Sequence, residues 1–168
     1  MPRHTSEAGF TLIELIVVTA LIGILLAIGT MDFNSWNRKT KIESVTRELH
    51  TILNTARTES IFRKKRHAVV INGTATGYVF KRYSSENESR TASGTQTVSS
   101  TNGTYIMSKE SGATAVGRIF EFDVRGFTYD MDTIKIEPVN SGAMYDCVVI
   151  HEARTNLGKM EGVSCVQK

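Results

Sequence analysis

The pattern of hydrophobic and polar positions divides the chain into three parts. In the first part, residues 10–29 (FTLIELIVVTALIGILLAIG) form a continuous apolar run that contains one charged residue, Glu14. At about 1.5 Å per residue, a helix of this length spans about the 30 Å hydrocarbon core of a bilayer. No small-residue cleavage site of the A-x-A type closes the run, so it predicts a retained membrane-spanning helix rather than a secretory signal peptide.

In the second part, the hydrophobic residues recur at helical spacing with charged residues between them. The recurring positions are Ile42, Val45, Leu49, Ile52 and Ala56. Neither proline falls within 10–62, so we expect one helix to continue to about Phe62. Its apolar stripe should pack on a globular head, because an exposed stripe of that length favours aggregation.

In the third part, short alternating runs separated by turn residues predict an antiparallel sheet. We expect strands at 68–71, 78–83, 105–107, 119–123, 133–137, 147–151 and 162–166, with a hairpin turn at Asn72-Gly73. The Ser/Thr-rich segment 84–104 holds too little apolar surface to offset its ordering entropy, so we expect a mobile loop there. The predicted fold class is α+β, with a long N-terminal helix packed on a mainly antiparallel β-sheet head.

Glu14 is the exceptional residue of the apolar run. An unpaired carboxylate at the centre of a bilayer costs about 2.5 to 3.5 kcal/mol. One interpretation places Glu14 at the interface, where the positive end of the helix dipole favours it. The other requires a positive partner, either a free α-amino group made by cleavage nearby or a group on a neighbouring subunit.

The run Gly9-Phe10-Thr11-Leu12-Ile13-Glu14 follows a short polar leader with Arg3 and His4 and begins a long apolar helix. This arrangement resembles the class III signal of type IV pilins and type II secretion pseudopilins. The resemblance implies cleavage between Gly9 and Phe10 by a prepilin peptidase and N-methylation of Phe10. It also implies that Glu14 pairs with the terminal amine of an adjacent subunit during filament assembly.

A looser resemblance covers much of the remaining chain. Residues 121–126 with the strand after them, and the C-terminal strand, loop and strand, are similar to the H-type minor pseudopilin and related minor pilins. The implied partners are other pilins or pseudopilins through the N-terminal helix, the prepilin peptidase and an inner-membrane assembly platform. The implied domains are a leader at 1–9, a transmembrane and filament-core helix at 10–29, its amphipathic continuation at 30–66 and a β-rich head at 67–168.

The resemblance also implies a location. It places the chain in a bacterial inner membrane as a single-pass protein with a periplasmic head, and later in a periplasmic or extracellular filament. Residues 30–66 hold nine basic and four acidic side chains, an excess that by the positive-inside rule argues for a cytoplasmic head. The specific cleavage motif outweighs this charge count, and Arg3 and His4 of the leader supply an opposing cytoplasmic charge.

Two cysteines, Cys147 and Cys165, flank a polar segment predicted as a loop at 152–161, and they lie in predicted neighbouring strands. They are too few for a disulfide scaffold or a four-cysteine zinc site. A bridge between them would stabilise the fold by about 3 kcal/mol, whereas the alternative is two separately buried thiols. The resemblance to pilins with a disulfide-closed C-terminal loop favours the bridge, and with it an oxidising compartment.

Two groups of basic residues suggest an alternative function, a DNA-binding minor pilin for natural transformation. The candidate phosphate-binding residues are Arg63, Lys64, Lys65, Arg66, Arg154 and Lys159. The first four also suit a solvated helix end, where the negative dipole favours cations. A net charge of +3 does not by itself predict nucleic-acid binding.

No motif of an enzyme, metal site or cofactor site is found in the sequence. It lacks H-E-x-x-H, C-x-x-C, Walker, G-x-S-x-G and G-x-G-x-x-G patterns, and its four histidines are far apart. We therefore expect no cofactor and no catalytic residue. The predicted function is a non-enzymatic subunit of a type IV pilus-like filament, a minor pilin or minor pseudopilin, acting in pilus assembly or type II protein secretion.

Overall fold

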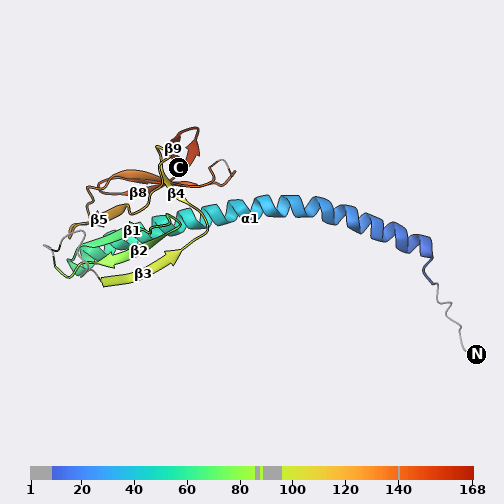
Figure 1. Ribbon diagram of the computed structural model, residues 1–168, viewed down its shortest axis with the longest axis horizontal. Helices are drawn as coiled ribbons and strands as arrows, with labels where there is room; N and C mark the ends of the chain where they lie inside the picture. The colour runs from blue at the N-terminus through green and yellow to red at the C-terminus, as the bar shows by residue number, and fades with distance from the viewer. Residues whose placement is uncertain (1–8, 86–87, 89–95, 140) are drawn as a thin grey trace, which may run out of the picture. The chain divides into compact units, whose positions relative to one another are not determined.

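The computed structural model describes residues 9–85, 88, 96–139 and 141–168. Within these residues the chain forms a long helix, α1 (Leu12–Arg63), followed by nine strands, β1 to β9 (Figure 1). Contacts within the chain divide it into two compact units, Met1–Asn37 and Arg38–Lys168, which are described separately. The second unit contains the C-terminal half of α1 together with both sheets.

Helix α1 forms without interruption, as the absence of proline predicts. At its start, the Thr11 hydroxyl oxygen accepts the backbone N–H of Glu14 at 3.3 Å, which satisfies one of the free N–H groups of the first turn. The helix ends at Arg63 because Lys64 adopts a left-handed conformation with φ of 52°. Glycine is the usual residue at such a position, since a Cβ atom is strained there.

The strands form two antiparallel sheets. The four-stranded sheet has the order β3-β2-β1-β5 and contains β1 (His67–Ile71), β2 (Gly77–Arg82), β3 (Gln96–Asn102) and β5 (Ile119–Phe122). The five-stranded sheet has the order β4-β6-β7-β8-β9 and contains β4 (Met107–Lys109), β6 (Asp132–Ile136), β7 (Cys147–Ile150), β8 (Thr155–Glu161) and β9 (Ser164–Gln167). The α+β fold with a long helix and antiparallel sheets is therefore confirmed.

The C-terminal half of α1 buries one face against both sheets in a single hydrophobic core. The fully buried helix positions recur at spacings of four and three: Ile42, Thr46, Leu49, Leu53, Ala56 and Ser60. The predicted stripe is correct at three positions, but Val45 and Ile52 are only partly buried. Between 49 and 56 the buried positions are spaced four and then three residues apart, whereas the predicted stripe was spaced three and then four. Leu53 is therefore buried where Ile52 was expected. Core partners from the sheets include Val69, Phe80, Phe120, Ile134 and Val148.

Two segments predicted as loops contain strands, and these predictions are wrong. Within 84–104, residues of β3 pair along β2 from Gly77↔Asn102 to Arg82↔Gln96, and within 152–161 the strand β8 pairs with both β7 and β9. Strand pairing needs only backbone N–H and C=O groups, so a polar segment can form an edge strand without apolar side chains. Residues 86–87 and 89–95 of the first predicted loop lie outside the described residues.

Candidate functional site

The predicted cleavage site lies immediately before α1. Gly9 and Phe10 have no regular secondary structure, and the Phe10 side chain is 81% exposed. A Cβ atom built on Gly9 would meet no heavy atom of the described chain within 4 Å. The peptide bond between Gly9 and Phe10 is therefore in an open, non-helical segment, as a protease substrate requires. The leader residues Arg3 and His4 lie outside the described residues.

Glu14 lies in the first turn of α1, with an exposed side chain. Among the described residues no hydrogen bond or ion pair involves its carboxylate, although its backbone N–H is capped by Thr11. Phe10, Glu14, Leu15, Val18 and Thr19 together line a hollow of about 250 Å³. The carboxylate thus stands at the border of an apolar hollow, where a charged group from outside could reach it.

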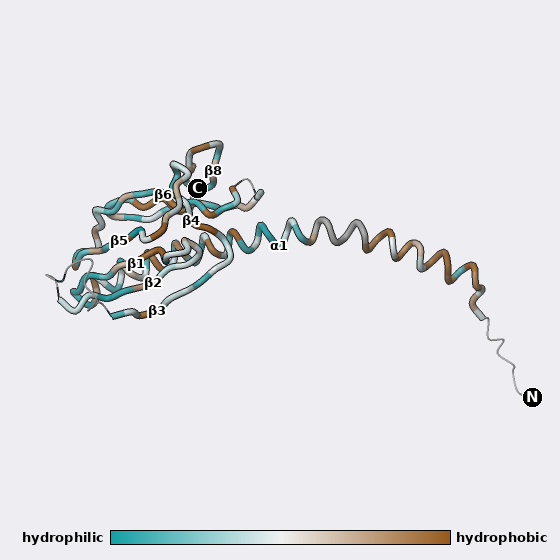
Figure 2. Tube along the Cα trace, in the orientation of Figure 1, coloured by the Kyte–Doolittle hydropathy of each residue, from teal (hydrophilic) through white to brown (hydrophobic). Residues whose placement is uncertain are grey.

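The helix around Glu14 presents its apolar residues on all sides. From Leu12 to Leu26 the large hydrophobic side chains are between 47% and 77% exposed, and Figure 2 shows hydrophobic residues predominating along the N-terminal part of α1. Apolar surface of this extent on a water-exposed helix is unfavourable unless lipid or protein covers it. The apolar surface of the first unit therefore needs lipid or another protein to cover it.

The N-terminal residues match a family model described as the prokaryotic N-terminal methylation motif, over residues 4–30. This match supports a type IV pilin-like protein. The match includes the whole run from Gly9 to Glu14, which carries the resemblance. No curated protein and no solved structure matches the chain.

The prediction that residues 10–29 span a membrane is not confirmed. In the part of the chain that the structure describes, no helix combines the length and the apolarity needed to cross a membrane.

A disulfide joins Cys147 of β7 to Cys165 of β9, with their Cα atoms 6.2 Å apart. The bridge that the pilin resemblance implied is therefore present. The prediction that the two cysteines lie in neighbouring strands is wrong, because β8 pairs with both and lies between them. Cys147 is the register partner of Gly158 in β8, so the bridge passes over β8 at that glycine.

The six basic residues predicted for DNA binding are in different surroundings. Arg66 is only 17% exposed, pairs with Glu121 at 2.8 Å and lies over the ring of Tyr83. Arg63 pairs with Glu59, and this contact lowers the pKa of the Glu59 carboxyl. Arg154 is exposed between β7 and β8, and Lys159 is half-buried in β8. Arg66 is thus a structural residue, and its side chain is not free for a phosphate.

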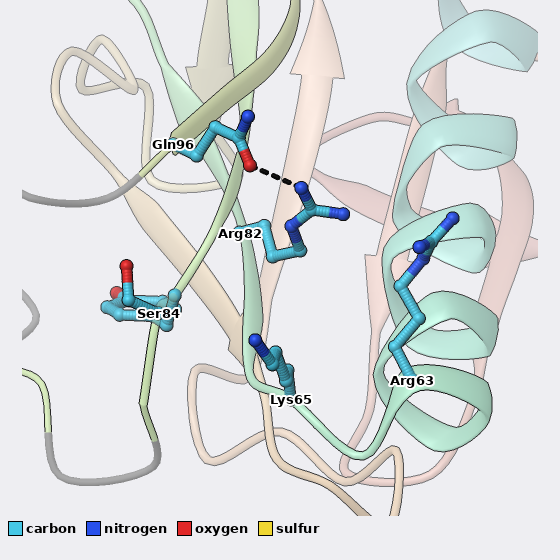
Figure 3. A pocket seen from close by; sticks show the side chains of 6 residues that line it. Arg63, Lys65, Arg82, Ser84 and Gln96 are labelled. Carbon is cyan, nitrogen blue, oxygen red and sulfur yellow. Dashed lines mark hydrogen bonds between the residues drawn. The ribbon is translucent and has the colours of Figure 1, made fainter.

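The structure brings Arg63 and Lys65 together with Arg82, a residue that was not among the predicted site residues. They line a pocket with Arg82, Tyr83, Ser84 and Gln96 (Figure 3). Arg82 is two residues from Phe80 on β2, so both side chains point to the face of the sheet that packs on the helix. The signal for this site in the sequence was a basic residue, Arg82, at the end of an alternating row of β2 residues whose other members face the core.

The histidines of the described chain take separate positions. His67 is buried and donates from Nδ1 to the carbonyl of Lys65 at 2.9 Å, while burial lowers its pKa. His50 contacts the carbonyl of Thr155 at 3.2 Å, and His151 contacts the side-chain amide of Gln167 at 3.0 Å. In residues 9–85, 88, 96–139 and 141–168, no group of three or more His, Cys, Asp or Glu side chains could hold a metal ion.

Proposed function

We propose that this chain is a non-enzymatic subunit, a minor pilin or minor pseudopilin, of a type IV pilus-like filament that acts in pilus assembly or type II protein secretion. One observation carries the proposal. The exposed apolar part of α1, residues 12–26, bears a single carboxylate, Glu14, four residues after Phe10 within the methylation motif. The free energy falls when the same helices of other subunits cover this apolar surface.

We further propose how the subunit is processed and stored. A prepilin peptidase cleaves between Gly9 and Phe10 and the new terminal amine of Phe10 is methylated. Until assembly, the apolar helix holds the subunit in a bacterial inner membrane, with the head on the periplasmic side. An assembly platform in that membrane then transfers it into the filament. The absence of any charged residue from residues 15–29 supports this storage.

In the assembled filament, Glu14 pairs with the terminal amine of Phe10 of an adjacent subunit. Two considerations support this role. The carboxylate borders a hollow that is otherwise lined by Phe10, Leu15, Val18 and Thr19, and removal from water makes an unpaired charge costly. A positive partner at that hollow therefore favours the correct register of subunits over a register that leaves the carboxylate unpaired.

Incorporation into filaments tests the role of Glu14. The full chain and its Glu14→Gln variant are co-expressed with a prepilin peptidase and a filament assembly system, and the sheared filament fraction is probed for the subunit. We expect Glu14→Gln to be cleaved normally but to fall at least about tenfold in the filament fraction. Glu43→Gln, which removes a partly exposed carboxylate that pairs with Arg47 in the same helix, should be incorporated normally. Equal incorporation of all three proteins would contradict the proposal.

Neighbouring genes distinguish the two machines within this proposal. A secretin, an assembly ATPase, further pseudopilins and exported hydrolases encoded beside the chain would indicate type II secretion. A retraction ATPase would indicate a pilus.

DNA binding by a minor pilin is the alternative function. It has less support, because Arg66 is held by Glu121 and only Arg63 and Lys65 of the six candidates share a pocket. Salt-dependent binding of duplex DNA to the full chain, weakened by Arg154→Gln and Lys159→Gln together, would favour this alternative. The absence of binding at low salt would exclude it.

A further inference from the structure

A basic pocket of about 450 Å³ lies within the unit Arg38–Lys168, where the end of α1 meets the rim of the four-stranded sheet. Its lining comes from four places: the last turn of α1, the connection to β1, the end of β2 and the start of β3. Figure 3 shows Arg82 in the centre, Arg63 on the helix and Lys65 on the connection. Three cationic side chains of different origin thus share one recess.

Strand pairing and one strained residue bring the cations together. Arg82 is the register partner of both His67 in β1 and Gln96 in β3, so it occupies the middle strand of a three-strand row. Lys64 ends the helix in a left-handed conformation, which is costly for a residue with a side chain, and the turn leads directly to Lys65.

The positive charge of the pocket is only partly balanced within the described chain. Glu59 pairs with Arg63, and the charge of Arg82 also helps to lower the pKa of the Glu59 carboxyl. The Glu88 carboxylate accepts the backbone N–H of Ser84 at 2.6 Å, and no described carboxylate makes an ion pair with Lys65 or Arg82. Arg82 donates instead to the neutral side-chain oxygen of Gln96. Like charges gathered in a recess repel one another, so an anion bound there would lower the free energy of the folded state.

The negative end of the helix dipole explains only part of this arrangement. It favours cations in and just after the last turn, which accounts for Arg63 and Lys65. It does not account for Arg82, because β2 brings that residue in from a distant part of the sequence. The convergence of helix and sheet cations on one recess indicates a ligand.

We propose that this pocket binds a phosphate group, carried either by free phosphate or by a small phosphorylated molecule. The guanidinium groups match phosphate oxygens in a forked geometry, Lys65 adds a point charge, and Ser84 and Gln96 offer neutral hydrogen-bond donors. The volume falls in the range of small-molecule sites, about 300 to 1,000 Å³, which leaves room for a group attached to the phosphate. The proposal does not depend on the filament role, since every lining residue belongs to the unit Arg38–Lys168.

Calorimetric titration of the full chain in detergent micelles tests this site with two probes, inorganic phosphate and glucose 6-phosphate. We expect saturable binding that weakens about tenfold in Arg82→Gln and in Lys65→Gln. Lys81→Gln is the matched control, because Lys81 precedes Arg82 on β2, points to the other face and does not line the pocket. Its affinity should stay within about twofold of that of the unaltered chain. Thermal unfolding of each variant verifies that it is folded.

The two probes distinguish the two sources of the phosphate group. Tighter binding of glucose 6-phosphate indicates a small phosphorylated molecule, and equal binding indicates free phosphate. An independent readout is His67, whose pKa should rise when an anion binds beside its neighbour Arg82. No saturable binding of either probe, or an equal loss of affinity in Lys81→Gln, would overturn the proposal.

Discussion

A Cβ atom built on Gly158 would lie 2.5 Å from the sulfur of Cys165, closer than any real Cβ contact. The same atom would lie 3.2 Å from the sulfur of Cys147. The disulfide therefore crosses β8 at a position where the absence of a side chain leaves room for it. Gly158 and the two cysteines form one structural unit of the five-stranded sheet.

Replacing Gly158 with alanine should prevent or strongly distort this bridge. The expected loss is most of the stabilisation that a disulfide gives, about 2 to 4 kcal/mol in the free energy of unfolding. Thiol titration of the unfolded chain and urea denaturation measure the two effects. Gly73→Ala is the control, because an added Cβ there meets nothing within 4 Å of the described chain. A fully formed bridge with an unchanged urea midpoint in Gly158→Ala would refute this reading of the site.

The pair formed by Arg66 and Glu121 should contribute far more to stability than exposed pairs on the same protein. Glu121 also accepts the Tyr83 hydroxyl at 3.1 Å, so the network is largely removed from water. We expect Arg66→Met to lower the free energy of unfolding by about 3 kcal/mol, because it removes the cation that faces a buried carboxylate. Arg47→Met, which breaks an exposed helix pair with Glu43, should cost about 0.5 kcal/mol. Equal losses in urea denaturation would contradict the assignment of Arg66 as structural.

Leu53 should be more important to the core than its neighbour Ile52, although the apolar pattern favours Ile52. Leu53 is fully buried, whereas Ile52 is partly buried at the edge of the core. Leu53→Ala should cost about 2 to 5 kcal/mol in the free energy of unfolding, and Ile52→Ala clearly less. The reverse order of losses would mean that α1 is rotated about its axis relative to the structure.

Two aspartates should make the stability depend on pH in opposite directions. Burial raises the pKa of Asp146, although the Met160 N–H donates to its carboxylate at 2.6 Å. Because the pKa of Asp146 is raised in the folded state, its neutral carboxyl contributes to stability at low pH. This contribution to the free energy of unfolding is lost as the pH rises above 3.8, the ordinary pKa of an aspartate. Asp146→Asn should therefore be more stable than the unaltered chain at pH 7, with a difference that shrinks toward pH 4.

Asp123 provides the opposite case. Burial acts to raise its pKa, but hydrogen bonds from Phe127 and Arg125 lower it overall. The contribution of Asp123 is then present above its ordinary pKa and is lost as the pH falls, so Asp123→Asn should be less stable at pH 7. Thermal unfolding of both variants between pH 4 and 7 measures the two trends. The same sign of change in both variants would show that burial does not dominate at Asp146.

The sequence predicts those parts of the molecule in which side-chain pattern determines structure. Helix α1 is an example, since the apolar period and the absence of proline are both local signals. The strands β3 and β8 are missed because backbone pairing with a neighbouring strand, rather than their own side chains, holds them. Arg82 and Gly158 are missed for a related reason, because their roles depend on residues that only the fold brings near them.

The mass of the N-terminal peptide shows whether the chain is processed as a prepilin. The full chain is expressed with and without a prepilin peptidase, and mass spectrometry identifies its first residue. We expect a chain that begins at N-methylated Phe10 when the peptidase is present, and no cleavage when Gly9 is replaced. A chain that still begins before Arg3 in the presence of an active peptidase would contradict the proposed processing and, with it, assembly through the amine of Phe10.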